Sequence, residues 1–397
     1  MSGSATFRRA ALSVVLLAAA GGSAACGSPQ QAAGGGDGPL RVGIIYSQTG
    51  PLAGYGRQYA DGFKAGLAYA TQGTGKVGGR TIDVTYADDA GDPAKAVAAA
   101  KDLIGKGYRV LGGSTASGVA TQLAPLAATN KVLFVSGPAA TDALTGLNRY
   151  TFRSGRQSYQ DVQTAKAYLG AGDGTGKKVL VFAPDSVFGK SNVAAVQAII
   201  GGAGGATVTN IAVPATATDF TPFARQAKAA APDLLFVAWA GSTASAMWQA
   251  LDQQGVLAST TVVTGLDSRA TWPVFGAAGS RLHLLAHYFD GATDNPAEQA
   301  LAKAVPGGRT DLFQPDGFAA AQMIVHALDK GGDDVDRMIT ALEGYRFDSV
   351  KGTLTVRAED HALLQPMFHA KLSGDTATLT GTIGAADAAP PAAAMKG

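Results

Sequence analysis

Residues 47–56, with the sequence SQTGPLAGYG, form the segment best suited to hold a small charged molecule. They follow an apolar strand predicted at 41–46 and precede a helical run at 59–71. A strand that opens through Gly and Pro into a helix leaves free backbone N–H groups at the helix N-terminus, where a carboxylate or phosphate binds well. Tyr55 would stand over that site as an aromatic wall. The segment predicts ligand binding without naming the ligand.

The motifs of catalysis and nucleotide binding are incomplete in this chain. Gly54 and Gly56 follow a strand, as in a dinucleotide fingerprint, but Tyr59 occupies the place of the third glycine. The run GTGKK at 174–178 precedes a strand instead of following one, and no Gly-x-Ser-x-Gly elbow is present. We therefore predict no catalytic residue and no cofactor.

His283 and His287 share the parity of one strand face in the apolar run 282–289. They could form a metal pair or simply lie on a packed strand face. No Cys is near and the acids begin only at Asp290, so the sequence favours packing and predicts no metal site.

The N-terminus has the layout of a secretory signal peptide. Arg8 and Arg9 precede an apolar stretch at 10–20 and the small residues 23–25, and the stretch is too short to span a membrane. Cys26, the only cysteine, comes next, as in a bacterial lipobox. We predict a signal peptide at 1–25 and lipidation of Cys26. An ordinary cleaved signal with an incidental Cys is the alternative.

Two segments flanking the main body lack apolar periodicity. Residues 26–39 are rich in Gly, Ala and Gln and predict a flexible, lipid-anchored linker. Residues 385–397, rich in Ala and Pro, predict a disordered tail.

The chain between these segments is too long for one core and predicts two lobes. A formal charge of +2 without a basic cluster argues against nucleic-acid binding. Apolar strands alternate with helical runs, and the alternation restarts near Lys178. The strands are predicted at 42–46, 82–86, 110–112, 132–135, 179–182, 234–239 and 261–264. The pattern predicts an α/β fold of two doubly wound parallel sheets, with ligands at the carboxyl ends of the strands.

Four segments resemble, in their order, the Leu/Ile/Val-binding-protein family of type I periplasmic solute-binding proteins. They are residues 86–97 (YADDAGDPAKAV), 110–118 (VLGGSTASG), 134–142 (FVSGPAATD) and 182–190 (FAPDSVFGK). Asp92 before Pro93 in the first segment is also a good helix start. The similarity covers about 40–370 and includes the loop at 47–56.

The resemblance implies two α/β lobes joined by a three-strand hinge. The crossings would fall near 153–158, 286–288 and 350–354. Lobe 1 would then comprise 40–155 and 288–350, and lobe 2 would comprise 156–287 and 351–384.

The resemblance also implies which residues of lobe 1 hold a solute carboxylate. Ser117 and Thr141 match the loop hydroxyls, with backbone groups offered by Ala139 and Ala140. A helix N-cap for the run 119–129 is the alternative role of Ser117.

Residues of lobe 2 match the remaining ligand positions of the family. Phe188 pairs with Tyr55 as an aromatic clamp, and Trp239 and Ser242 fall in a ligand loop. Asp267 matches the acid that holds the ammonium of an amino acid, unless Arg269 neutralises it internally.

The implied protein is an extracytoplasmic solute-binding lipoprotein of an ABC importer and no enzyme. It would be a monomer, tethered by lipid alone to the outer face of the cytoplasmic membrane, and would deliver a small apolar amino acid to the permease subunits. An amine-free carboxylate such as an aromatic acid, or an amide or urea-type solute, is an alternative. The segment 360–369 resembles family members that take aromatic or other carboxylates. A signalling ligand sensor is the alternative from another class.

Overall fold

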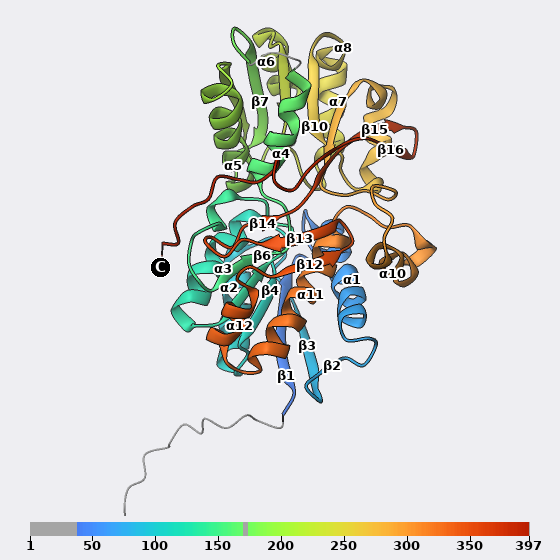
Figure 1. Ribbon diagram of the computed structural model, residues 1–397. Helices are drawn as coiled ribbons and strands as arrows, with labels where there is room; N and C mark the ends of the chain where they lie inside the picture. The colour runs from blue at the N-terminus through green and yellow to red at the C-terminus, as the bar shows by residue number, and fades with distance from the viewer. Residues whose placement is uncertain (1–37, 170–173, 397) are drawn as a thin grey trace, which may run out of the picture. The chain divides into compact units, whose positions relative to one another are not determined.

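The computed structural model describes residues 38–169 and 174–396. The predicted signal peptide, Cys26 and nearly all of the predicted linker lie outside this range. None of the helices within this range has both the length and the hydrophobicity that a membrane span requires. The fold is α/β with two lobes, as predicted (Figure 1).

Lobe 1 is built around a six-stranded sheet with the order β2-β3-β1-β4-β5-β6, parallel except for β2. Its strands are β1 (Leu40–Tyr46), β2 (Lys76–Val77), β3 (Arg80–Asp88), β4 (Val110–Gly113), β5 (Leu133–Ser136) and β6 (Thr151–Arg153). Its helices are α1 (Ala53–Ala70), α2 (Pro93–Gly105), α3 (Ser117–Asn130), α10 (Pro296–Ala304), α11 (Gln314–Gly331) and α12 (Val335–Leu342).

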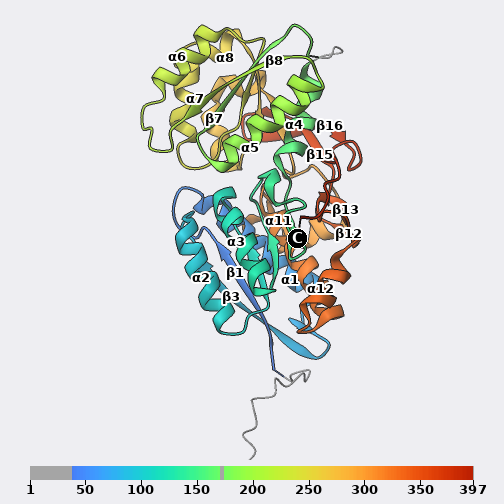
Figure 2. The ribbon, with the colours of Figure 1, turned by 90° about the vertical axis from the view of Figure 1, so that its left-hand side faces the viewer.

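Alternation along β1 explains the layers of lobe 1. Val42 and Ile44 point into the core shared with α1, α11 and α12, whereas Ile45 points into the core shared with α2 and α3. Figure 2 shows α2 and α3 lying along one side of this sheet. Helices therefore cover both faces of the sheet. The parallel strands all end at the same edge, and the loops that follow them there are free to bind a ligand.

Lobe 2 is built around a seven-stranded sheet with the order β16-β15-β11-β10-β9-β7-β8. Its strands are β7 (Lys178–Pro184), β8 (Thr207–Val213), β9 (Leu234–Val237), β10 (Thr261–Gly265), β11 (His283–Ala286), β15 (Met367–Ser373) and β16 (Thr376–Ile383). Its helices are α4 (Ser158–Ala165), α5 (Val187–Val196), α6 (Thr221–Ala230), α7 (Ala244–Gln253), α8 (Val256–Ser259) and α9 (Trp272–Phe275). Strands β15 and β16 run antiparallel to their neighbours, so the sheet is mixed and mostly parallel.

Between β1 and β16 of the described chain, three connections run from one sheet-bearing lobe to the other, and the third lies elsewhere than predicted. The first two passages follow β6 and β11, but the third lies at residues 365–366, between β14 (Leu363–Leu364) and β15. Residues 350–354 instead belong to a hairpin of β12 (Arg346–Ser349) and β13 (Gly352–Val356), in which Ser349 pairs with Gly352. The positive φ of Gly352 (99°) permits this turn, and Leu354 packs into the core of lobe 1.

The C-terminal segment, predicted to be disordered, is held against the loop between β13 and β14. Arg357 donates to the carbonyls of Pro390 (2.8 Å) and Pro391 (3.2 Å), and Ala393 N donates to Asp360 Oδ2 at 2.9 Å. The composition did not reveal this order because the anchoring side chains lie elsewhere in the chain.

Candidate functional site

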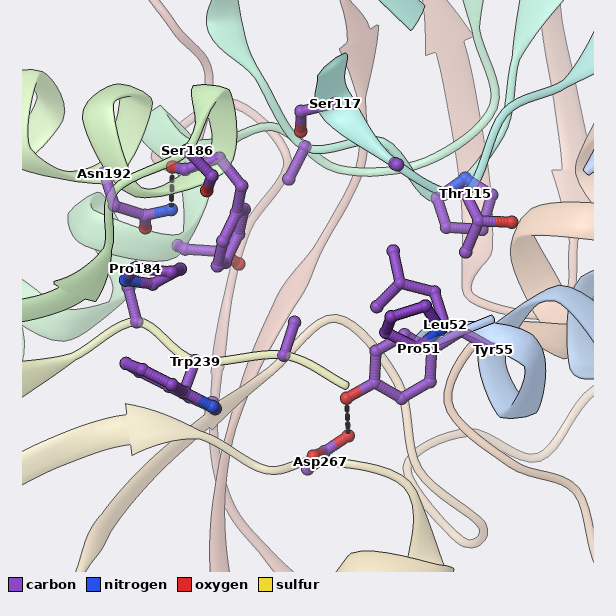
Figure 3. A pocket seen from close by; sticks show the side chains of 18 of the residues that line it. Pro51, Leu52, Tyr55, Thr115, Ser117, Pro184, Ser186, Asn192, Trp239 and Asp267 are labelled. Carbon is purple, nitrogen blue, oxygen red and sulfur yellow. Dashed lines mark hydrogen bonds between the residues drawn. The ribbon is translucent and has the colours of Figure 1, made fainter. Parts of the chain in front are cut away.

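A cavity of about 430 Å³ opens where loops from both sheets meet (Figure 3). Its walls come from the loops that follow β1, β4 and β5 in lobe 1 and β7, β9, β10 and β11 in lobe 2. The carboxyl ends of parallel strands are the expected ligand-binding edge of such sheets. The volume lies in the range of small-molecule sites.

Hydrogen bonds join the two lobes across this cavity. The Tyr55 hydroxyl donates to Asp267 Oδ1 at 2.7 Å and accepts from Gly241 N at 3.2 Å. Ser242 N donates to the Pro51 carbonyl at 3.1 Å. Tyr55 is therefore more than an aromatic wall, because its hydroxyl links α1 to two loops of lobe 2.

Asp267 lies on the cavity wall with neutral donors around it (Figure 3). Burial raises the pKa of its carboxyl, while hydrogen bonds from the Tyr55 hydroxyl and Ser268 N oppose that rise. Arg269 turns away, lying 3.9 Å from Asp311 and 4.0 Å from Asp290. Within residues 38–169 and 174–396, no Lys or Arg forms an ion pair with Asp267. The internal neutralisation considered from the sequence does not occur.

Seven of the nine predicted ligand-binding residues line the cavity. They are Tyr55, Ser117, Ala140, Phe188, Trp239, Ser242 and Asp267. Ala139 and Thr141 do not line it, because their polar groups form hydrogen bonds within the protein. Both of their carbonyls accept hydrogen bonds from Arg153, and Thr141 Oγ1 accepts from Ala143 N.

Ser117 does not cap the helix that it begins. Ala116 is the N-cap of α3, and no side-chain cap hydrogen bond forms there. The alternative role of Ser117 is therefore wrong. Ser117 and its neighbours Thr115, Ala116 and Gly118 place the first turn of α3 at the cavity.

An aromatic wall occupies the lobe 2 side of the cavity. Trp239 packs edge-on against Phe220, with ring centroids 5.4 Å apart, and its Nε1 donates to Thr243 Oγ1 at 3.1 Å. Phe188, from α5, lines the same cavity. These rings give rigid apolar area with little polar demand.

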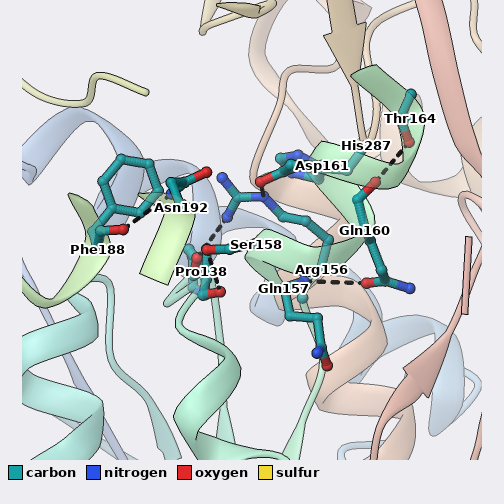
Figure 4. A network of polar contacts seen from close by, with 12 residues as sticks. Pro138, Arg156, Gln157, Ser158, Gln160, Asp161, Thr164, Phe188, Asn192 and His287 are labelled. Atoms are coloured by element: carbon teal, nitrogen blue, oxygen red, sulfur yellow. Dashed lines mark hydrogen bonds and ion pairs between the residues drawn. The ribbon is translucent and has the colours of Figure 1, made fainter. Parts of the chain in front are cut away.

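Sequence reasoning missed three ionisable residues that line the cavity near the connections between the lobes. Arg156 comes from the first passage between the lobes, Asp161 from α4, and His287 from the end of β11 (Figure 4). Arg156 Nε lies 3.3 Å from Asp161 Oδ2, and burial raises the pKa of Asp161 to about 6. Their clustering depends on long-range folding, and the only local signal was two arginines, Arg153 and Arg156, in a predicted crossing.

The two histidines do not form a metal pair. His283 packs against Tyr168, with ring centroids 4.7 Å apart, whereas His287 is buried with Nε2 3.6 Å from Asp316 Oδ2. Burial lowers the pKa of His287 well below its usual range. Among the described residues, no group of three or more His, Cys, Asp or Glu is arranged to hold a metal ion.

The family model for periplasmic binding proteins matches residues 39–377. The chain belongs to the periplasmic binding protein family. It is accordingly a solute-binding protein of the ABC-transporter type and not an enzyme.

Curated relatives and a solved structure agree with this membership. The Leu/Ile/Val-binding protein BraC3 of Rhizobium johnstonii is 27% identical over 80% of this chain and 87% of its own length. A Leu/Ile/Val-binding protein homolog of Brucella melitensis is 28% identical, covering 83% and 90%. The crystal structure of an ABC-type branched-chain amino acid transporter from Rhodopseudomonas palustris is 31% identical, with TM-score 0.71, and the match covers 89% of this chain and 99% of that one.

A second solved structure shares the fold at lower identity. This R. palustris solute-binding protein, in complex with 4-hydroxybenzoate, is 22% identical, with TM-score 0.78 and coverage of 87% and 97%.

Proposed function

We propose that this protein captures a small α-amino acid with an apolar side chain and delivers it to the permease of an ABC importer. The observation that carries the proposal is the state of Asp267. It is a largely buried carboxylate on the cavity wall, and its hydrogen-bond donors, the Tyr55 phenol, Ser268 N and the Thr271 side chain, are all neutral. A solute ammonium would supply the missing positive charge.

The other parts of the cavity suit the rest of an amino acid. The hydroxyl of Ser117, the first turn of α3 and the backbone at Ala140 offer donors to a carboxylate. Trp239 and Phe188 offer apolar area to the side chain. The named functions of the Rhizobium and Brucella relatives, and of the 31% identical structure, support this substrate class.

Binding would act through a shift in population between lobe arrangements. A solute that contacts Ser117 in lobe 1 and Asp267 in lobe 2 stabilises the arrangement in which both walls meet. The bonds from Tyr55 and Ser242 already define that arrangement. We further propose that Cys26 carries the lipid that keeps the protein near its permease; Cys26→Ser should then move the protein out of the membrane fraction.

A second candidate is an amine-free carboxylate such as an aromatic acid. The pairing of Trp239 with Phe220 and the absence of a hydroxyl on Phe188 favour it. Its weakness is Asp267, since a solute without an amine would leave a buried negative charge without a counter-ion.

Thermal melting with two solute panels tests the proposal. One panel contains leucine-like amino acids, and the other contains carboxylates of matched shape without the amine. A solute at ~100 times its dissociation constant should stabilise the protein by about 2.7 kcal/mol, which raises the melting temperature by a few degrees. A shift confined to the amine-free panel would overturn the amino-acid assignment.

A further inference from the structure

We propose that Arg156 binds the carboxylate of the solute from the connection between β6 and α4, where it lines the cavity. This inference rests on the proposed function, because it assigns the second charge of an amino acid. It adds a cation to the loop donors of lobe 1.

Arg156 belongs to the connection between the lobes rather than to either wall. It lies between β6 and α4, and neighbouring backbone bonds fasten this connection to the end of β5 and to the loop that follows. Ser154 N donates to the Ser136 carbonyl at 2.8 Å, and Ser158 N donates to the Ala140 carbonyl at 2.7 Å. A solute can therefore meet Arg156 before the two walls come together.

The guanidinium is held in place by contacts on several sides. Nη1 donates to the Pro138 carbonyl at 2.9 Å, and the group lies 5.6 Å from the centre of the Phe313 ring. Its side chain is only 12% exposed. A planar cation fixed in this way loses little conformational freedom on binding a carboxylate.

Donors of this guanidinium remain unsatisfied. Nε is buried without a well-formed hydrogen bond, although Asp161 Oδ2 lies 3.3 Å away. Among the described residues, Nη1 is the one nitrogen of this guanidinium that donates a well-formed hydrogen bond. Figure 4 shows the guanidinium directed toward the side of the site where Phe188 and Asn192 lie. A guanidinium carries five N–H donors on a rigid fork, so it can serve Asp161 and a solute carboxylate together.

The surrounding charges leave Arg156 available. Of the nearby acids, Asp316 is already paired with Lys351, whose Nζ lies 2.8 Å from Asp316 Oδ1. Asp161 is the acid in contact with Arg156. Burial of the His287 imidazole lowers the pKa of His287 and favours the neutral form of that side chain.

Arg156 and Asp267 both line the cavity. The pKa of Tyr55 is raised by burial and by Asp267 and lowered by Arg156, so both charges act on one phenol. No ion pair joins these two residues among those described. The cavity thus offers separate positive and negative groups, as a zwitterion requires.

Calorimetric titration with L-leucine and L-leucinamide tests this assignment, because the amide keeps the ammonium and removes the carboxylate charge. We expect Arg156→Gln to weaken leucine binding about 10-fold or more and to change leucinamide binding less than about 3-fold. Arg156→Lys, which keeps the charge without the fork, should fall between. Arg149→Gln is the control, since Arg149 pairs with Asp336 on the surface and should change neither affinity.

The outcomes separate this inference from the proposed function. A parallel loss of both affinities in Arg156→Gln and Arg156→Lys would show a purely structural role and overturn the inference alone. If the wild-type protein binds leucinamide as tightly as leucine, the inference also fails. If it binds neither, the proposed function fails as well. Melting curves establish whether each variant is folded. If Arg156→Gln does not fold, Arg156→Lys still tests the inference.

Discussion

The Tyr55 hydroxyl donates to Asp267 Oδ1 at 2.7 Å and so joins α1 of lobe 1 to the loop after β10 of lobe 2. The ring packs against Phe313, with centroids 4.7 Å apart, which leaves the hydroxyl to meet the carboxylate. One side chain thus links the arrangement of the lobes to the charge state of the residue proposed to hold the solute ammonium.

Replacing Tyr55 with Phe should weaken amino-acid binding while keeping the aromatic wall. The change removes one donor from Asp267 and leaves Gly241 N without its acceptor, which should cost about 1–3 kcal/mol. Because the Tyr55 bond opposes the burial that raises the pKa of Asp267, its loss should raise that pKa further. Calorimetry at several pH values should show that both proteins lose amino-acid affinity as the pH falls. The loss in Tyr55→Phe should set in at a higher pH than the loss in wild type.

The exposed Tyr69 on the same helix provides the control, and Tyr69→Phe should leave binding unchanged. If leucine binding by Tyr55→Phe depends on pH as it does in wild type, the Tyr55 hydroxyl does not influence the protonation of Asp267, and the prediction is wrong.

Asp161→Asn should alter how stability depends on pH. Burial raises the pKa of Asp161 from 3.8 to about 6, so between these values the native protein retains a proton that the unfolded chain has released. The stability from this group is complete below about pH 4 and is lost as pH rises through about 6, by roughly 3 kcal/mol. In urea unfolding, wild type should therefore lose stability relative to Asp161→Asn across this window.

Asp252→Asn, on the exposed side of α7, is the control for the same chemical change away from the cavity. A pH-independent difference between wild type and Asp161→Asn would contradict the assigned titration of Asp161.

Two glycines of α1 should respond in opposite ways to alanine. A Cβ at Gly62 would lie 1.8 Å from the Gln314 carbonyl oxygen of α11, whereas a Cβ at Gly54 would meet nothing within 4 Å. We expect Gly62→Ala to destabilise the protein by about 2 kcal/mol or more through forced separation of α1 and α11. Gly54→Ala should be neutral or stabilise by up to about 1 kcal/mol. Equal urea midpoints for both variants would contradict the close helix packing.

Local signals predicted much of the fold. Asp92 before Pro93 indicated a helix start, and the Asp92 side chain does accept from Ala94 N and Lys95 N. The apolar runs predicted as parallel strands lie in or overlap β1, β3, β4, β5, β7, β9 and β10. These signals work because caps and strand alternation depend on neighbours in the sequence.

Contacts between distant segments were beyond the same reasoning. Arg156, Asp161 and His287 come together only when the connection after β6, helix α4 and the end of β11 converge at the cavity. The short strand β14 and the anchoring of residues 390–396 likewise depend on partners elsewhere in the chain. Matching Thr141 and Ala139 to a family position did not reveal that Arg153 occupies their carbonyls.

The most direct test of the account is calorimetric titration of wild type and Asp267→Asn with L-leucine and with 4-methylpentanoate, which lacks the amine. Wild type should bind leucine and reject the amine-free acid. The variant should lose about 2–3 kcal/mol of leucine affinity, because the partner of the ammonium changes from a carboxylate to a neutral amide. The difference in affinity between leucine and 4-methylpentanoate should then become smaller. Tight binding of 4-methylpentanoate by wild type, or unchanged leucine binding by Asp267→Asn, would contradict the role of Asp267 as the ammonium site.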